Sequence, residues 1–397
     1  MLRFFLIFTF GFLVIFTSVA SEGTDTSQVT VPADSLASDS LKSLPFYKKG
    51  IIGKVYRYFE DTNKVHEEKD FDISFIGGPY YSSDTKFGIA LVAAGQYRHD
   101  KEDKTIPMSD VSLTAKATTS MFFELGLDGN HIFPHDRQRL SYSVSISYVK
   151  TSFWGIGYDM DVNDENESKY KYVCSRAEAA YKWRLGQKFF IGPLATFDYI
   201  NGRQFEKPWL WEGESDRTFN VGLGFTAQID TRDNLTAPKK GLNLRLDQRF
   251  NPKFLANKYA FSMTELTLST YNGLWKGCTM AFRYHTRLTY GNTPWGLLST
   301  LGGSDNMRGY FEGRYRDKME MDATLELRQH VWRRNGVVAW IGAGTVFPEF
   351  SALRWRMVLP NWGFGYRWEF KKNMNVRVDI GFGRHEKGLN FSINEAF

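Results

Sequence analysis

After its first twenty residues, the sequence contains no stretch that approaches the roughly 20 consecutive apolar residues of a membrane-spanning helix. A helical membrane protein is therefore excluded. The beginning of the sequence is different: Arg3 precedes an apolar run over 4–16, and residues 18–20 (Ser-Val-Ala) have the small-x-small pattern of a cleavage site. Because this run is too short to span a bilayer, residues 1–20 are predicted to be a secretory signal peptide.

Cysteine is scarce, and its placement suggests no metal site. Cys174 and Cys278 stand far apart in two separate strand-like segments. An exported protein could oxidise them, but their spacing matches no ligand pattern. We interpret them as two isolated thiols.

The sequence also lacks the usual signatures of catalysis and of nucleic-acid binding. Its seven histidines form no HExxH motif, and no serine stands in a nucleophile-elbow pattern. We therefore expect no enzyme activity, no catalytic residue, no bound metal and no cofactor. The net charge of +6 is modest, and lysine and arginine do not cluster with stacking aromatics. This argues against a nucleic-acid partner.

The segment 21–70 is predicted to be a flexible leader that contains one short helix. Its first part is rich in serine, threonine and aspartate, which is typical of disordered chain. Within 45–59, apolar residues recur at helical spacing among lysines and arginines, which predicts a basic amphipathic helix. Such a helix can lie on a membrane interface, dock on other envelope proteins, or pack under the following domain, and these interpretations stay open.

From residue 71 to residue 397 the apolar residues recur with a period of two. The clearest examples are 140–148, 319–327 and 376–380, and in the last two charged residues occupy one face. The segments run about ten residues or more, as a tilted membrane strand requires. In a membrane barrel, the apolar face meets lipid and the polar face lines the lumen. The high aromatic content of 16% agrees with aromatic girdles at the two interfaces.

Sixteen such segments predict an all-β fold, a 16-stranded antiparallel transmembrane β-barrel preceded by the short amphipathic helix. With both termini in the periplasm, the longest extracellular loops are expected at 151–168, 199–216 and 290–317, whereas most periplasmic turns are short. The predicted strands are 71–80, 86–98, 108–118, 120–132, 138–150, 169–184, 187–198, 217–230, 241–250, 258–272, 276–289, 318–331, 335–346, 357–369, 373–384 and 388–397.

The most informative loop connects the eleventh and twelfth predicted strands. It is rich in glycine, which permits backbone conformations closed to other residues, and it carries one arginine at its tip. The loop resembles the arginine-glycine-aromatic motif of the bacterial surface antigen superfamily of outer-membrane barrels. The residues that carry this resemblance are Gly302, Gly303, Arg308, Gly309 and Tyr310.

Further motifs resemble the same family. The turn from the eighth to the ninth strand is similar to the family's periplasmic turn motif, through Asp230, Arg232, Asp233, Pro238 and Gly241. Glu326 resembles the acidic position of the twelfth strand, and Phe397 resembles the terminal aromatic that serves as an insertion signal. The resemblance implies a location in the outer membrane of a Gram-negative bacterium. It also implies a part in membrane-protein insertion, outer-membrane assembly or polypeptide transport, with nascent outer-membrane or secreted polypeptides as partners.

The sequence departs from the family pattern in three places. The aspartate that many members carry on the thirteenth strand is replaced by Gly342, so Arg308 is expected to pair with Glu326 or, as second choice, Asp322. The terminal strand has Glu395 where an apolar residue is common. Finally, about fifty residues separate the signal peptide from the first strand, too few for the polypeptide-transport-associated domains of about 75 residues that classical members carry.

Two other functions on the same scaffold stay open. One is a passive porin-like channel, which requires an open lumen. The other is an accessory structural barrel in a larger outer-membrane complex, with the 45–59 helix as its docking element. For the assembly function we expect a weak seam between the first and last strands, because Gly77, Gly78 and Pro79 limit pairing at one end.

Overall fold

The computed structural model describes residues 71–98, 106, 108–211, 213–371 and 373–397. All described residues belong to one compact unit, within Tyr58–Phe397. The predicted signal peptide and the leader with its 45–59 helix lie outside the described residues. Within the described part, no helix has the length and apolar character needed to cross a membrane.

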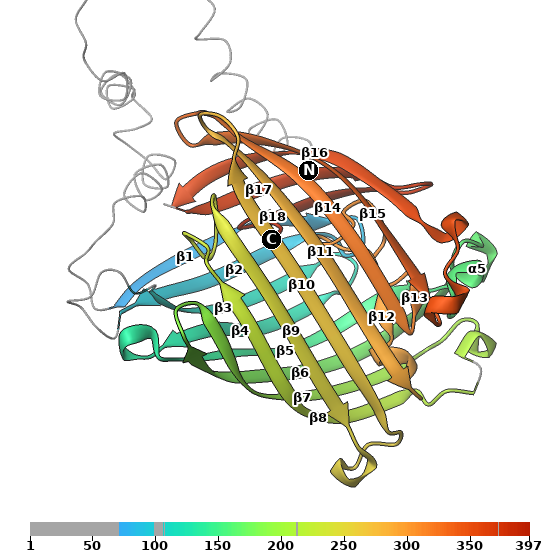
Figure 1. The fold of residues 1–397 in the computed structure, drawn as a ribbon. Helices are drawn as coiled ribbons and strands as arrows, with labels where there is room; N and C mark the ends of the chain where they lie inside the picture. Colours follow the sequence, from blue (N-terminus) through green and yellow to red (C-terminus); the bar gives the residue numbers. More distant parts are fainter. Residues whose placement is uncertain (1–70, 99–105, 107, 212, 372) are drawn as a thin grey trace, which may run out of the picture. The chain divides into compact units, whose positions relative to one another are not determined.

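Sixteen antiparallel strands close into one barrel (Figure 1), which confirms the predicted fold class. A separate two-stranded sheet, β12 (Ser299–Thr300) with β13 (Arg316–Asp317), lies in the connection between β11 and β14. The barrel strands, in chain order, are β1 (Phe71–Ser82), β2 (Lys86–Tyr97), β3 (Ser109–Thr118), β4 (Phe123–Ile132), β5 (Gln138–Phe153), β6 (Ser168–Leu185), β7 (Phe189–Arg203), β8 (Arg217–Asp230), β9 (Gly241–Asn251), β10 (Phe261–Gly273), β11 (Cys278–Gly291), β14 (Met319–Trp332), β15 (Asn335–Phe347), β16 (Leu359–Lys371), β17 (Met374–Phe382) and β18 (Lys387–Ile393).

The end of the last strand was predicted wrongly. The expected strand over 388–397 stops at Ile393, because Asn394 adopts a left-handed backbone with φ of 66° and turns the chain out of the sheet. The last four residues, 394–397, are called the C-terminal tail below. The other boundaries differ from the predicted ones by a few residues, since alternation marks a strand more sharply than its ends.

The strands present an apolar outer face and a polar inner face, as alternation requires. Leu91, Ile146 and Ile341 are more than half exposed on the outside, where a bilayer would cover them. On the inside, charged side chains such as Asp322, Glu326 and Arg377 are buried. The inner face is therefore packed against other parts of the protein.

Much of that packing comes from the connection between β11 and β14, residues 292–318, called loop six below. It contains the short helix η5 (Trp295–Leu297) as well as β12 and β13. Trp295 joins one buried aromatic cluster with residues of the β5–β6 and β7–β8 regions, and Tyr310 joins a second with residues of the β15–β16 region. Loop six therefore lies inside the barrel wall and bridges opposite sides of it.

Both cysteines, Cys174 on β6 and Cys278 on β11, are buried and free. This agrees with the interpretation of two isolated thiols. They offer no covalent link between strands, so the closure of the barrel depends on strand pairing and on side-chain packing.

Candidate functional site: the lumenal loop and the barrel seam

The tip of loop six is pressed against the inner face of β17. Gly309 has a φ of +120°, and a Cβ there would lie 2.6 Å from the carbonyl carbon of Gly381. Conversely, a Cβ on Gly381 would lie 2.0 Å from the backbone oxygen of Arg308. Both glycines are required because the two backbones approach more closely than any side chain allows. Gly302 and Gly303 also have positive φ values, +105° and +111°, and shape the start of the turn.

Arg308 is the buried anchor of this tip, with only 1% of its surface exposed. Its Nη1 lies 2.8 Å from Asp379 Oδ2, and its Nη2 donates to Glu326. The guanidinium also stacks over the ring of Trp340, with its carbon 3.6 Å from the ring centroid. Asn361 donates to the Arg308 carbonyl oxygen. Two carboxylates and an aromatic face therefore offset the desolvation of this cation.

Of the two partners expected for Arg308, the structure places Glu326 against it and Asp322 elsewhere. Asp322 lies beside Arg283, with 3.7 Å between Nη1 and Oδ1, and is hydrogen-bonded to His285. Asp379, on β17, was missed as a partner. The alternating segment 376–380 already marked its side chain as facing the lumen, but nothing in the sequence brings β17 next to loop six.

The ion pair continues into a network that joins loop six, β14, β16, β17 and the C-terminal tail. Arg328 on β14 donates from Nε to Glu326, at 2.6 Å. Arg367 on β16 bonds to Asp379 and also to Glu395 of the C-terminal tail, at 2.8 Å in the second case. Every carboxylate in this group has at least one arginine, which is the condition for burying such charges without a large penalty.

Tyr310 fixes the end of the motif. Its ring is buried, its hydroxyl donates to the carbonyl oxygen of Pro360 at 2.6 Å, and the hydroxyl accepts from the backbone N–H of Arg384 at 2.8 Å. The ring occupies the space beside Gly383, where a Cβ would lie 2.5 Å from it. The tyrosine therefore links loop six to the extracellular ends of β16 and β17.

The predicted turn motif forms a compact structure between β8 and β9. Asp230 and Arg232 form a bidentate pair with two distances of 3.0 Å, and Asp233 Oδ1 accepts backbone N–H bonds from the two lysines after Pro238. Gly241 has a φ of +108°, and a Cβ there would lie 2.3 Å from a carbonyl oxygen of the same turn. All five residues of the motif thus take part in one turn, directly or through the backbone next to them.

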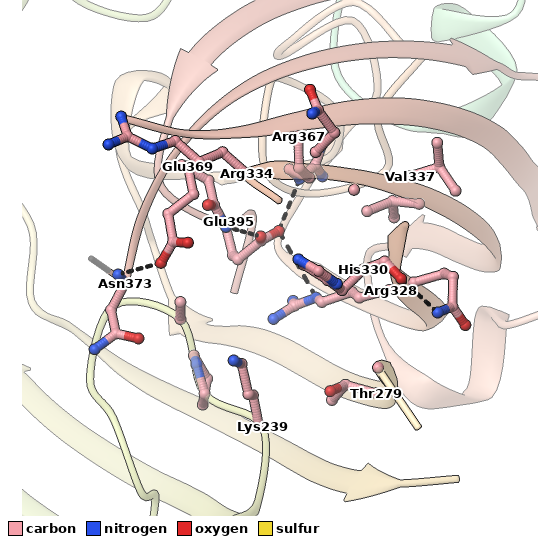
Figure 2. A pocket seen from close by; sticks show the side chains of 18 residues that line it. Lys239, Thr279, Arg328, His330, Arg334, Val337, Arg367, Glu369, Asn373 and Glu395 are labelled. Carbon is pink, nitrogen blue, oxygen red and sulfur yellow. Dashed lines mark hydrogen bonds and ion pairs between the residues drawn. The ribbon is translucent and has the colours of Figure 1, made fainter. Parts of the chain in front are cut away.

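Beside this turn lies a pocket of about 110 Å³ at the periplasmic end (Figure 2). Its wall is mixed: Lys239, Arg328, Arg334 and Arg367 line it together with Glu369, Glu395 and neutral residues, among them buried Pro238. Figure 2 shows Arg328 and Arg367 reaching toward Glu395, which occupies part of the space.

The C-terminal tail folds into the barrel and does not continue the sheet. The Phe397 carbonyl oxygen accepts from Arg328 Nη2 at 2.8 Å, and the guanidinium lies 5.0 Å from the Phe397 ring. Tyr271 on β10 is the other aromatic neighbour, with 6.5 Å between ring centroids. The predicted insertion signal therefore lies outside the last strand, and its signalling role stays a prediction.

The seam between β1 and β18 is short. Only two residue pairs join these strands, Tyr81 with Phe391 and Ser82 with Asn390. Continuing this register would place Pro79 opposite Ile393, and proline has no N–H to donate. Among the described residues, β1 and β18 are thus paired only near the extracellular end.

Comparisons with known proteins agree with this architecture. A family model described as the Omp85 superfamily domain matches residues 67–397. BamA from Haemophilus ducreyi lacking POTRA domains 1–3 is 13% identical with a TM-score of 0.54, over 94% of this chain and 79% of that chain. CdiB from Acinetobacter baumannii is 11% identical with a TM-score of 0.52, over 82% of this chain and 60% of that chain.

CdiB from Escherichia coli is 8% identical with a TM-score of 0.52, over 85% of this chain and 69% of that chain. Identities this low establish a shared fold. No curated protein matches the chain in sequence. Because the family model spans the whole described barrel, the chain belongs to the Omp85 superfamily, and its barrel resides in the outer membrane of a Gram-negative bacterium.

Proposed function

We propose that this barrel acts in the insertion or assembly of outer-membrane proteins, or in the transport of a polypeptide, by opening the seam between β1 and β18. Its partners are then the lipid bilayer and nascent outer-membrane or secreted polypeptides. Family membership supports the general role, and the two-pair seam supports the mechanism. No chemical step is required, because an exposed strand edge binds a client strand through main-chain hydrogen bonds.

The seam is the observation that carries this proposal. Elsewhere the pairing is extensive: β5 and β6 are paired over sixteen residues, and β10 and β11 over thirteen. Opening β1 from β18 breaks two residue pairs, whereas opening any of these other contacts breaks many more. From Phe71 to Tyr80, β1 is paired with β2 and shares no register pair with β18 among the described residues, so opening the seam would present this strand to a client.

Loop six supports the wall while the seam moves. Arg308 ties the loop to β14 through Glu326 and to β17 through Asp379. These strands lie on the β18 side of the seam, where buried ion pairs anchor the loop; on the other side, the Glu312 N–H of loop six donates to Asp84 Oδ2 in the β1–β2 turn at 3.2 Å. Lateral opening requires firmly held strands on one side of the seam and a weakly held strand on the other.

A disulfide across the seam tests the proposal. Tyr81→Cys combined with Phe391→Cys joins register partners of β1 and β18. In cells depleted of the native protein, the oxidised double variant should fail to restore the normal set of outer-membrane and secreted proteins. Reduction of the disulfide should restore function, because the clamp alone prevents opening.

The matched control places the same Phe391→Cys against the other neighbour, with Val378→Cys on β17. This clamp joins strands that are already fully paired and should leave function intact. Both variants must first show the heat-dependent gel shift of a folded barrel. Full function of the oxidised Tyr81–Phe391 clamp would refute the seam mechanism.

A further inference from the structure

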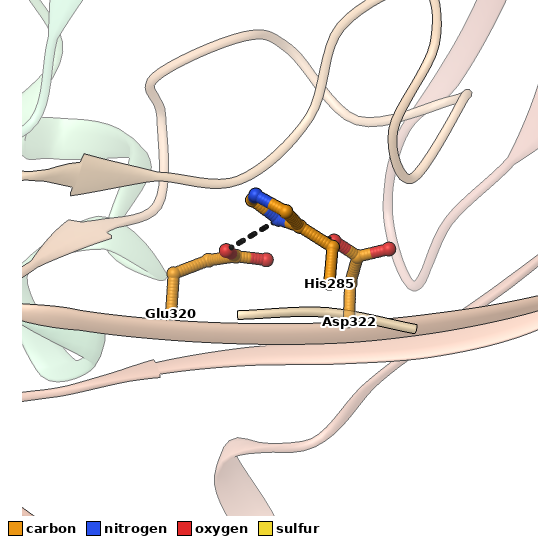
Figure 3. Close-up of side chains that lie close together, drawn as sticks. All are labelled: His285, Glu320 and Asp322. Carbon is orange, nitrogen blue, oxygen red and sulfur yellow. Dashed lines mark hydrogen bonds and ion pairs between the residues drawn. The ribbon is translucent and has the colours of Figure 1, made fainter. Parts of the chain in front are cut away.

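A histidine and two carboxylates converge inside the barrel, away from the arginine network (Figure 3). His285 lies on β11, and Glu320 and Asp322 lie on the adjacent β14, where His285 and Asp322 are register partners. One ligand atom from each residue can be chosen so that all three atoms lie within 4.8 Å of one another. All three side chains are buried, with 7% of His285 and 2% of each carboxylate residue exposed.

The arrangement leaves one imidazole nitrogen shared between two carboxylates. Nδ1 lies 3.2 Å from Asp322 Oδ2, to which it is hydrogen-bonded, and 3.1 Å from Glu320 Oε2. Glu320 Oε2 is fully buried and accepts no hydrogen bond from the described residues. A buried carboxylate oxygen without a donor is costly. A positive centre between Nδ1 and the two oxygens would satisfy all three atoms.

The other ring nitrogen is also occupied. Nε2 lies 3.2 Å from Glu265 Oε1 on β10. If Nε2 carries the proton and donates to Glu265, Nδ1 presents a lone pair toward the two carboxylates. This is the usual arrangement around metal-ligating histidines, in which a carboxylate behind the ring fixes the tautomer.

The neighbouring cations are engaged mainly outside this space. Arg249 lies beside Glu265, with Nη2 3.4 Å from Oε2, and Arg287 donates from Nε to a methionine sulfur at 3.2 Å. Arg283 donates to the side chain of Asn306 in loop six and lies 3.7 Å from Asp322 Oδ1. That oxygen is not the one that is hydrogen-bonded to His285.

We propose that His285, Glu320 and Asp322 bind a divalent transition-metal ion of the Zn²⁺ type. A mixed nitrogen and oxygen donor set favours such an ion over Mg²⁺ or Ca²⁺. A tetrahedral ion with ligand distances near 2.1 Å separates its ligands by about 3.4 Å, close to the separations of 3.1 and 3.2 Å seen here. Because β11 leads into loop six and β14 leaves it, the ion would join the two ends of the loop.

Zinc titration of the purified full-length protein tests this site. After removal of metals with a chelator, calorimetry in detergent micelles should show one tight Zn²⁺ site per barrel. His285→Gln, Glu320→Gln and Asp322→Asn should each weaken that site by more than about 100-fold, since even an outer partner is worth roughly 10–100-fold. Co²⁺ should give a visible absorption band in the native protein that His285→Gln abolishes.

Two control variants remove a histidine or a carboxylate without touching the site. His330→Gln removes an exposed histidine, and Glu178→Gln removes a lumenal carboxylate that is held by Arg245 and Arg249. Both should keep the tight site, whereas Glu265→Gln should weaken it about 10–100-fold. No tight zinc site in the native protein, or an undiminished one in folded His285→Gln, would overturn the proposal.

Discussion

The two edges of β18 are unlike each other. On one side, β18 is paired with β17 over seven residues, and on the other it is paired with β1 over two. The same backbone thus takes part in a firm contact and in a weak one. The difference lies in the neighbours, since a proline stands in β1 where the next pairs would form and the C-terminal tail leaves the sheet at Asn394.

The firm edge is supported by a buried ion pair from loop six, whereas loop six gives the weak edge one partly exposed hydrogen bond. Loop six packs its backbone against Gly381 and its arginine against Asp379, both on β17. The weak edge is held at its extracellular end by the two residue pairs and by Ser83, whose hydroxyl accepts the Leu389 N–H at 2.9 Å. Loop six adds one hydrogen bond there, from the Glu312 N–H to Asp84 Oδ2 at 3.2 Å. The buried ion pairs of loop six therefore lie on the β17 side of the seam, and we expect β1 to separate from β18 before the rest of the barrel unfolds.

Among the variants proposed here, removing Arg308 should cause the largest loss of stability on the β17 side of the seam. Arg308→Ala leaves Glu326 and Asp379 with one partner fewer in a buried site, and we expect a loss of about 3–5 kcal/mol in the free energy of unfolding. Urea unfolding of the barrel in detergent measures it. Arg308→Lys retains the charge but cannot bond to two carboxylates in the same geometry. Its free energy of unfolding should therefore lie between those of the native protein and Arg308→Ala. An unchanged unfolding midpoint for Arg308→Ala would show that loop six does not stabilise the strands on the β17 side of the seam.

Adding a methyl group on the firm edge should have the next largest effect. Gly381→Ala places a Cβ 2.0 Å from the Arg308 carbonyl oxygen, and such overpacking costs about 1–3 kcal/mol. Gly78→Ala on β1 is the matched control, because a Cβ there meets no atom of the described residues within 4 Å. Unfolding in urea should separate the two variants. Equal destabilisation would mean that loop six adapts to the added atom.

Restoring a backbone donor on the weak edge should make the two edges more alike. Pro79→Val supplies an N–H, which adds about 0.5–1.5 kcal/mol if it extends the ladder toward Ile393. Amide hydrogen exchange at the periplasmic end of β18 should slow, and function should fall because the seam opens less often. If exchange is unaffected, the tail rather than the proline limits pairing, and Glu395→Gln becomes the variant that extends the seam.

The smallest expected effect comes from pH at the extracellular end of the seam. Burial, and then the nearby Glu312, raise the pKa of Asp84 in the β1–β2 turn from 3.8 to about 7. Because the folded state favours the protonated carboxyl, this packing is most stable below pH 3.8 and is weakened as the pH rises through about 7. The effect is small since Asp84 is partly exposed.

Cross-linking of Tyr81→Cys with Phe391→Cys, compared at pH 5.5 and pH 8, measures this pH dependence. The seam should be cross-linked more completely at the lower pH once the reaction is corrected for thiol ionisation. Asp84→Asn should abolish the difference, because the amide does not titrate. A difference that persists in Asp84→Asn would assign the effect to another group.

A structural feature could be predicted from the sequence when the residues that form it lie close together in the chain. Alternation along 140–148 or 319–327 marks a strand and its two faces without reference to any other segment. The Asp230–Arg232 pair is equally local, because two residues on one turn suffice to make it. The end of β18 was missed because Phe397 falls on the apolar face of the expected strand and Glu395 was interpreted as a single departure from it. In the structure, Asn394 turns away, and its N–H donates to the Asn375 carbonyl at 2.6 Å.

The sequence by itself determined the strands, their order, the polar and apolar faces, the glycine-rich loop and the acidic strand beside it, because each rests on period-two alternation or on residues close in the chain. Only the tertiary structure decided that Asp379 shares Arg308 with Glu326, that His285 meets Glu320 and Asp322, and that β1 and β18 share two pairs. Barrel closure brings together side chains that stand far apart in the sequence. Strand register and loop packing decide which of them meet, and a pattern of neighbouring residues carries no information about either.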